Sequence, residues 1–176
     1  TTPRVQQREF VGNRDGSRSP PPIGALVQVR HDQPMWTLDH RVRVFVFQFV
    51  GPDPRYLLIR QKPRAEWPLG PVIGTVAMDE HLDDTVYREV AAETGLRRAE
   101  RVVDLSEPSK ELFGELGLVE WPFAFHVAAG TDKPAEVKPG PMVGEWAWMS
   151  FEEAFRTVEA RRDREALVRL QLRLAA

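Results

Sequence analysis

Two acidic side chains at helical spacing are the residues of this sequence best suited to chemistry. Glu89 and Glu93 lie four residues apart in GTVAMDEHLDDTVYREVAAETGL, residues 74–96. On a helix they project from the same side, one turn apart, and they share that side with the apolar Val86 and Val90. Carboxylates that face a core are costly unless a positive charge lies between them. The spacing therefore predicts a divalent-cation site.

The kind of metal follows from the side chains that the sequence offers. The chain has no cysteine, which excludes disulfides and thiolate metal sites and leaves His, Asp and Glu as ligands. Carboxylate oxygens suit Mg²⁺ or Mn²⁺, which keep several waters and take further ligands from substrate phosphates. The four histidines, His31, His40, His81 and His126, show no paired ligand spacing. A small molecule that carries phosphates is the expected substrate.

Residues around the two glutamates have expected supporting roles. Gly74 lies six residues before Glu80, in a segment predicted to be a loop, where a glycine lets the backbone approach a ligand closely. Arg88 lies outside the metal-facing side of the helix, and its side chain can reach back from there to Glu80. We expect the Arg88–Glu80 pair to be structural and to fix the loop against the helix.

The spacing of these residues resembles the signature of the Nudix hydrolases. That pattern is Gly, five residues, Glu, seven residues, Arg-Glu-apolar, any residue, Glu-Glu, any residue, Gly-apolar. The sequence matches it at Gly74, Glu80, Arg88, Glu89, Val90, Glu93, Gly95 and Leu96. It departs from the pattern at Ala92, where the family has the first glutamate of the Glu-Glu pair.

The resemblance implies a fold, an activity and a set of roles. The fold would be an α/β/α sandwich with a mixed β-sheet. The activity would be divalent-metal-dependent hydrolysis of the pyrophosphate bond in a nucleotide or nucleoside diphosphate derivative, with Mg²⁺ or Mn²⁺ as cofactor. Carried over to this chain, Glu89 and Glu93 would be catalytic metal ligands, and the Gly74 backbone would join the metal site. Glu89 would also orient or deprotonate the attacking water.

Ala92 removes one carboxylate from this pattern and opens an alternative. Another acid could replace it, and Asp79, Glu115, Glu120 and Glu145 are candidates, although a solvated surface acid is the favoured interpretation of each one alone. Among them Glu120 is favoured because it lies on a predicted strand beside aromatic residues, and it is also a candidate substrate-binding residue. The alternative is a catalytically weakened Nudix-fold domain that binds a nucleotide-type ligand as a sensor or interaction module. A purely structural acidic helix is the third interpretation.

A short basic segment provides candidate substrate contacts. Arg60 and Arg64 precede the Gly74 segment, and a guanidinium can bind a phosphate through two hydrogen bonds. A solvated basic turn explains the same residues equally well. Trp67 could stack on a base, but an aromatic plug that holds the loop is the favoured interpretation.

The first half of the chain is expected to contain a leader and a hairpin. Residues 1–22, rich in Arg, Gln, Ser and Pro, are interpreted as a low-complexity leader, and residues 23–176 as a single domain. Strands are predicted over residues 23–30 and 41–50, and the second is apolar on both faces. GPDP should form a tight turn into a strand over residues 55–61. Residues 62–74 are expected to form a loop.

The second half is expected to alternate helices and strands. A helix is predicted from Leu82 to Thr94, ended by Gly95. Strands follow over residues 100–107, 118–130 and 144–150, with a bulge or edge position at Pro122 and a loop over residues 131–141. Ser150 and Glu153 have the spacing of a capping box, and the last helix is expected to continue to the C-terminus. This order indicates a mixed sheet between helices.

Composition narrows the class of partner. A formal net charge of −2 and a pI near 6.1 provide no bulk attraction to nucleic acids or anionic membranes. No apolar stretch is long enough to suggest a membrane span or a signal peptide, so the cytoplasm is the expected location. The expected partner is a nucleotide-type small molecule, with no nucleic acid and no membrane. Because dimers are common in the family, a homodimer is compatible with the resemblance.

Overall fold

The computed structural model describes residues 37–130 and 132–176. The predicted leader over residues 1–22 and the predicted strand over residues 23–30 lie outside the described residues. The division into a leader and one domain from residue 23 stays a prediction.

A long hairpin forms the middle of the sheet. β1 spans Thr37–Val50 and β2 spans Asp53–Gln61, and they pair antiparallel with Val50 opposite Asp53. Gly51 adopts a φ of 61° in the turn between them, a conformation that glycine reaches without steric cost. The predicted hairpin is confirmed, and its first strand begins four residues earlier than expected, at Thr37 rather than Arg41.

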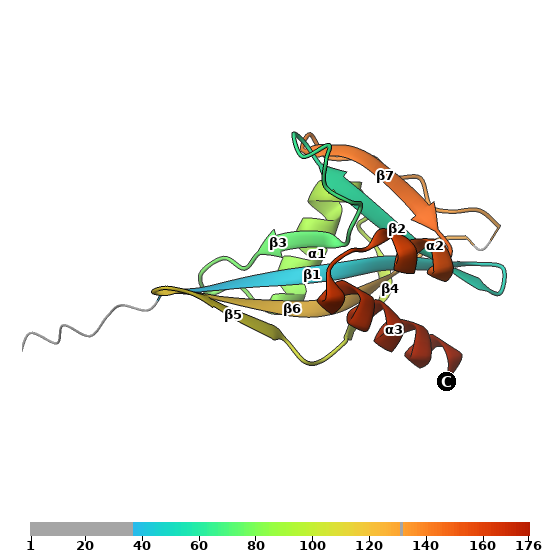
Figure 1. Ribbon diagram of the computed structural model, residues 1–176. Coiled ribbons are helices and arrows are strands. Elements are labelled where there is room, and N and C mark those ends of the chain that lie inside the picture. The colour runs from blue at the N-terminus through green and yellow to red at the C-terminus, as the bar shows by residue number, and fades with distance from the viewer. Residues whose placement is uncertain (1–36, 131) are drawn as a thin grey trace, which may run out of the picture. The chain divides into compact units, whose positions relative to one another are not determined.

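Within the described residues, seven strands form one mixed sheet, which Figure 1 shows. Besides β1 and β2, they are β3 Val72–Thr75, β4 Ala99–Asp104, β5 Ser109–Phe113, β6 Leu116–Val127 and β7 Val143–Met149. The strand order is β4-β6-β1-β2-β7, with β3 paired to β1 and β5 paired to β6. β1 and β6 run parallel, whereas the other pairs are antiparallel.

One segment predicted to be a loop contains a strand. β2 pairs with β1 from Val46 onwards, so the same edge of β1 is open between Arg41 and Val44. β3 fills that gap and pairs Gly74 with Val42. The prediction that Gly74 lies in a loop is therefore wrong. A four-residue strand that follows a proline carries too little pattern to be recognised in the sequence.

β6 is an interior strand whose register with β1 continues unbroken through Pro122, so the prediction of a bulge or edge position there is also wrong. On one side β6 pairs with β1 along its length. On the other side β5 pairs up to Glu120 and β4 pairs from Phe123 onwards. Pro122 lies between these two pairings, where its missing N–H removes no ladder bond on that side, and its carbonyl accepts from the Leu105 amide. β5 was not predicted.

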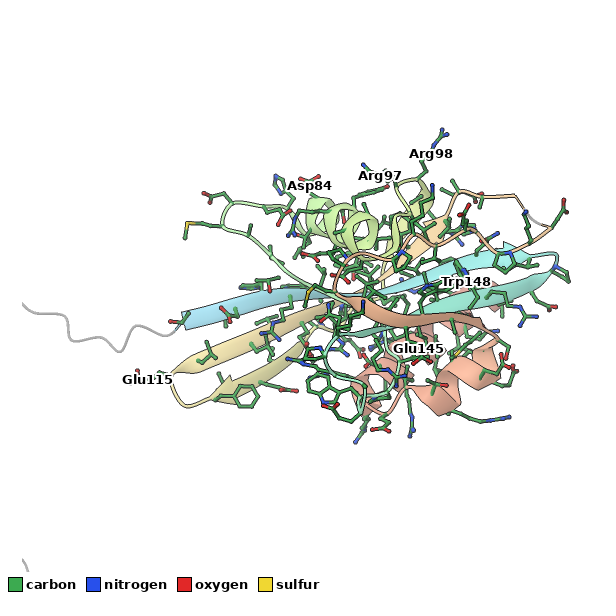
Figure 2. All side chains as sticks on the ribbon, turned by 90° about the horizontal axis from the view of Figure 1, so that it is seen from above. Asp84, Arg97, Arg98, Glu115, Glu145 and Trp148 are labelled. Atoms are coloured by element: carbon green, nitrogen blue, oxygen red, sulfur yellow. The ribbon has the colours of Figure 1, made fainter. Side chains whose placement is uncertain are left out.

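Helices cover both faces of the sheet, as Figure 2 shows from above. α1, Leu82–Thr94, packs Val86 and Val90 onto one face, together with even-numbered side chains of β1 such as Val44. α2, Phe151–Thr157, and α3, Arg161–Ala175, pack Ala154 and Leu167 onto the other. The expected α/β fold with helices on both sides of a mixed sheet is confirmed.

The helix ends follow the sequence at α1 and at the start of α2. α1 has the predicted bounds, and Gly95 ends it with a φ of 74°. Ser150 and Glu153 form both hydrogen bonds of the predicted capping box. The prediction of one continuous last helix is wrong because the chain is extended at Val158 and Ala160, which separate α2 from α3. Val158 is buried there against the sheet.

No helix among the described residues is long and apolar enough to cross a membrane.

Candidate functional site: an acid pair over a glycine strand

The side chain of Glu89 lies directly against the backbone of β3. A Cβ atom added to Gly74 would stand 2.0 Å from Glu89 Cγ and 2.3 Å from Glu89 Cδ. Such distances are far below carbon–carbon contact, so this position admits only a glycine unless Glu89 moves. The side chain of Glu89 is only 14% exposed. The strand and the helix thus hold this carboxylate in a close-fitting cradle.

Glu93 carries a buried oxygen that has no partner. Its Oε2 atom is shielded from solvent and accepts no hydrogen bond among the described residues. Burial raises the pKa of Glu93 above its ordinary value, the nearby Glu89 carboxylate raises it further, and a hydrogen bond from Gln61 opposes the shift. Burial and the Glu89 charge raise this pKa because, in the part of the chain that the structure describes, no positive charge compensates the ionised form of Glu93. An orphaned acceptor beside a second carboxylate is the arrangement that a cation would satisfy.

Arg88 ties three segments together next to this acid pair. Its Nε and Nη2 atoms each donate to Glu80 at 2.8 Å, and Nη2 also donates to the Thr75 carbonyl at 2.9 Å. The Nη1 atom donates to Glu89. Hydrogen bonds from Arg88 and from the Ala77 amide lower the pKa of Glu80 to about 2. The contact between Arg88 and Glu80 is the one expected from the sequence, whereas its contact with Glu89 was not foreseen.

The loop that contains Lys138 and Gly140 packs against the last turn of α1. The Lys138 amide donates to the Thr94 carbonyl, and the Gly140 amide donates to the Glu93 carbonyl. A Cβ on Gly140 would come within 2.3 Å of the Ala92 carbonyl oxygen, so the two backbones touch. The Ala92 side chain itself is exposed. This loop fixes the helix turn that carries Glu93, and nothing in its sequence had indicated that role.

The residues present fit a hard divalent cation, although with few ligands. Glu89 and Glu93 offer carboxylate oxygens from one side of a helix, and one of these oxygens is buried without a partner. Over residues 37–130 and 132–176, no group of three or more His, Asp or Glu side chains is placed to hold a metal ion. The pair therefore fits an ion that takes its other ligands from backbone, water and substrate. The metal-binding roles of Gly74, Glu89 and Glu93 stay predictions.

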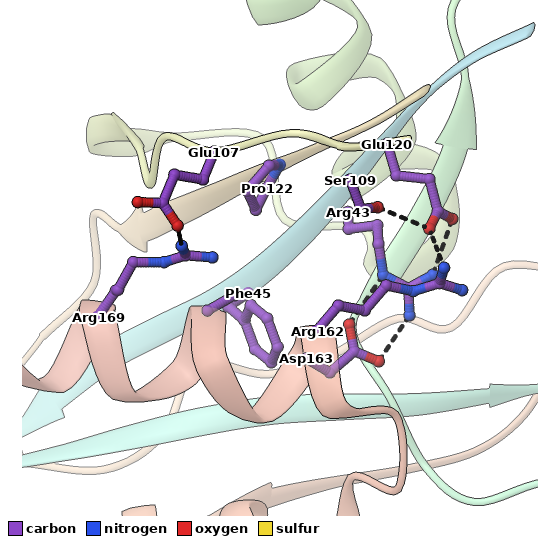
Figure 3. Close-up of a pocket in the computed structure, with 10 residues that line it drawn as sticks. Arg43, Phe45, Glu107, Ser109, Glu120, Pro122, Arg162, Asp163 and Arg169 are labelled. Atoms are coloured by element: carbon purple, nitrogen blue, oxygen red, sulfur yellow. Dashed lines mark hydrogen bonds and ion pairs between the residues drawn. The ribbon is translucent and has the colours of Figure 1, made fainter. Parts of the chain in front are cut away.

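Glu120 lies on the opposite face of the sheet from this pair, so the expectation that it replaces the missing carboxylate is wrong. Its neighbour Trp121 packs on the α1 side, and alternation along β6 turns Glu120 toward Arg162 and Asp163 of α3, as Figure 3 shows. There it is 3% exposed, accepts from Arg43 at 3.0 Å and pairs with Arg162 at 2.8 Å. Arg43 also donates to Asp163 at 2.8 and 2.6 Å.

The other candidate acids are not gathered around Glu89 and Glu93 either. Glu115 lies at the tip of the β5–β6 hairpin, far from α1 in Figure 2. Glu145 forms an ion pair with Arg60. Asp79 is exposed in the segment before α1, where it adopts a φ of 63°. None of them replaces the carboxylate that Ala92 lacks.

The two candidate arginines, Arg60 near the end of β2 and Arg64 after it, contact the loop that follows β2. Arg60 donates to the Trp67 carbonyl at 2.9 Å, and alternation along β2 places it on the face of Leu58, away from α1. The Arg64 guanidinium lies 3.9 Å from the centre of the Trp67 ring. Trp67 is 52% exposed and its ring contacts Arg64 of the same loop, so the interpretation of Trp67 as an aromatic plug that holds the loop stays a prediction. The structure does not bring Arg60 to the acid pair, and the substrate roles of Arg60 and Arg64 stay predictions.

Comparison with known proteins identifies the family of this chain. A family model described as NUDIX domain matches residues 39–170. The chain belongs to the Nudix family. No curated protein matches the chain.

Solved structures share this Nudix fold at low sequence identity. The C. elegans Ap4A hydrolase in a binary complex is 15% identical, with a TM-score of 0.61, covering 78% of this chain and 98% of that one. The NUDIX domain of Shewanella oneidensis NrtR complexed with ADP ribose is also 15% identical, with a TM-score of 0.61, covering 78% and 88%. The E. coli dihydroneopterin triphosphate pyrophosphohydrolase is 14% identical, with a TM-score of 0.62, covering 76% and 95%. At these identities the likeness concerns the fold.

Proposed function

We propose that this Nudix chain hydrolyses the pyrophosphate bond of a nucleotide or nucleoside diphosphate derivative with the help of Mg²⁺ or Mn²⁺. The observation that carries the proposal is the buried Oε2 of Glu93, which has no partner among the described residues and lies close to Glu89. Membership of the family and neighbours that hold or act on nucleotide-type molecules agree with it. An unsatisfied buried carboxylate lowers the stability of the fold, and a bound cation would offset this by supplying the missing partner.

Glu89 and Glu93 have separate roles in this proposed hydrolysis. A bound divalent ion would polarise the phosphate oxygens and favour ionisation of a water molecule. Glu93 would hold the ion through its free oxygen. Glu89, kept in place by Gly74 and by Arg88, would orient the water toward phosphorus and accept its proton. Attack by water then breaks the bridging P–O bond and leaves a phosphate on each product.

Substrate binding is assigned to the basic residues at the end of β2 and just after it. Arg64 is exposed and stacks on Trp67, which places a guanidinium beside an aromatic face that solvent can reach. We assign a substrate phosphate to Arg64. For Arg60 to do the same, it would have to exchange Glu145 for the phosphate, because that carboxylate holds it now.

A panel of nucleotides tests the activity. Phosphate or nucleotide release is measured with Mg²⁺, with Mn²⁺ and with EDTA, for the wild type, Glu93→Gln and Glu165→Gln. Glu165 is a control because it is an exposed glutamate of α3, on the far face of the sheet. We expect metal-dependent release that Glu93→Gln abolishes and Glu165→Gln leaves intact. Release that persists in Glu93→Gln would refute the proposed role of the acid pair.

A second function, binding of a nucleotide-type ligand without efficient turnover, is favoured by Ala92. Its exposed methyl group stands where the family has a carboxylate, and no other acid among the described residues replaces it. The same panel separates the two functions when affinity is measured alongside release. Binding in the absence of release would favour a sensor or interaction module over a hydrolase.

A further inference from the structure

A hollow of about 510 Å³ lies where the sheet extends beyond the first turn of α1. Its lining includes Leu38 and His40 of β1 and Trp121 of β6, together with the segment from Thr75 to Glu80 and Leu82 at the start of α1. Figure 2 shows the strands running well past the helix on this side. The sheet face thus stays uncovered over a space large enough for a small organic molecule.

An ordered pair of rings forms one side of this hollow. The rings of His40 and Trp121 lie 6.1 Å apart with an interplanar angle of 17°. The Trp121 Nε1–H donates to His40 Nδ1 at 3.1 Å. Since Nδ1 accepts that bond, the neutral imidazole carries its proton on Nε2, which makes it a donor. A flat face and a fixed donor are therefore available to a ligand, and both rings are partly exposed.

One carboxylate of the hollow is available to a ligand. Asp79 and Glu80 belong to the lining. Arg88 holds Glu80 through two hydrogen bonds, whereas Asp79 is exposed. Asp39 is also part of the lining, but alternation along β1 turns its side chain to the other face of the sheet. Asp79 can therefore accept hydrogen bonds from a ligand group that carries donors. Leu38 and Met78, which are 54% and 93% exposed, add apolar contact area.

We propose that this hollow is a second ligand site, which takes the flat, amino-bearing base of a nucleoside. The base lies against Trp121, and its exocyclic amino group donates to the carboxylate of Asp79. The site is distinct from the acid pair of Glu89 and Glu93, because none of its lining residues belongs to that pair. Binding therefore needs neither metal nor turnover, and the proposal stands or falls independently of the hydrolase activity.

Nucleosides that differ by a single amino group test the chemistry. Calorimetric titrations in EDTA compare adenosine with purine riboside, and guanosine with inosine, so each pair isolates one exocyclic amino group. We expect saturable binding of at least one amino nucleoside, and about tenfold weaker binding of its partner, because a hydrogen bond to a charged group is lost. Equal binding within both pairs, or no binding of either amino nucleoside at millimolar concentration, would overturn the proposal.

Matched variants locate the site. Trp121→Leu should weaken binding at least fivefold because the stacking face is lost. Asp79→Asn, an exposed and nearly isosteric change at a φ of 63° that asparagine also tolerates, should weaken it several-fold. The controls are Trp146→Leu, an exposed tryptophan of β7, and Asp53→Asn, an exposed aspartate at the other end of the β1–β2 hairpin. Affinity that is unchanged in Asp79→Asn, or lowered equally by the controls, would place the ligand elsewhere.

Discussion

Gly74→Ala is the substitution that most directly tests the cradle around Glu89. The added Cβ would stand 2.0 Å from Glu89 Cγ, whereas ordinary carbon–carbon contact begins at about 3.5 Å. The glutamate side chain must therefore move by about 1.5 Å or the strand must shift. Displacement of a reacting group by about 1 Å can lower a rate about 100-fold. Overpacking of this kind costs about 1–3 kcal/mol of the free energy of unfolding.

Two measurements separate loss of geometry from loss of the fold. Urea denaturation gives the free energy of unfolding, and steady-state hydrolysis with Mg²⁺ gives kcat. We expect a folded Gly74→Ala protein with kcat lowered about 100-fold. Gly130→Ala is the control, because a Cβ there meets no atom within 4 Å. A Gly74→Ala enzyme with unchanged kcat would show that the position of Glu89 is irrelevant to turnover and would refute the reasoning.

Three further substitutions probe the acids of the chain. In EDTA, burial and the Glu89 carboxylate raise the pKa of Glu93, so the wild type should lose stability as the pH rises through that pKa. Glu93→Gln should remove this loss and raise Tm at about pH 8. An unchanged dependence of Tm on pH would contradict this expectation. Ala92→Glu, at an exposed position, should lower the Mg²⁺ concentration at which Tm begins to rise, whereas a higher concentration would argue against a shared ion. Glu120→Gln should lower the free energy of unfolding, measured by urea denaturation, by about 3 kcal/mol and leave the rise of Tm with Mg²⁺ intact. Loss of that rise would indicate that Glu120 is a metal ligand after all.

The helix and its acids could be predicted from the sequence because their signals are local. Spacing along one helix places Glu89 and Glu93 together, and a glycine at the end of a periodic run stops the helix. The central hairpin could be predicted from the sequence for the same reason, since its apolar run and its turn residues are adjacent in the chain. These features depend on few contacts between distant residues.

The errors concern contacts between distant segments. Glu120 does not join the acid pair, because the face on which it lies depends on the pairing of β6 with β1, which the sequence does not reveal. β3 was missed because its formation depends on where β2 leaves the edge of β1. The break at Val158 reflects burial of that side chain against the sheet, whereas the helical pattern before and after it continues. Each case was decided by tertiary packing rather than by local propensity.

The strand position of Gly74 has a consequence for how an ion would meet the protein. A glycine in a free loop would have to be ordered whenever a ligand arrived, and the loss of chain entropy would weaken binding. Here its peptide groups belong to the ladder with β1, and Arg88 clamps the next carbonyl to the helix. The scaffold around the two acids is thus preorganised, so affinity should depend on the number and charge of the oxygen ligands more than on any folding of the site.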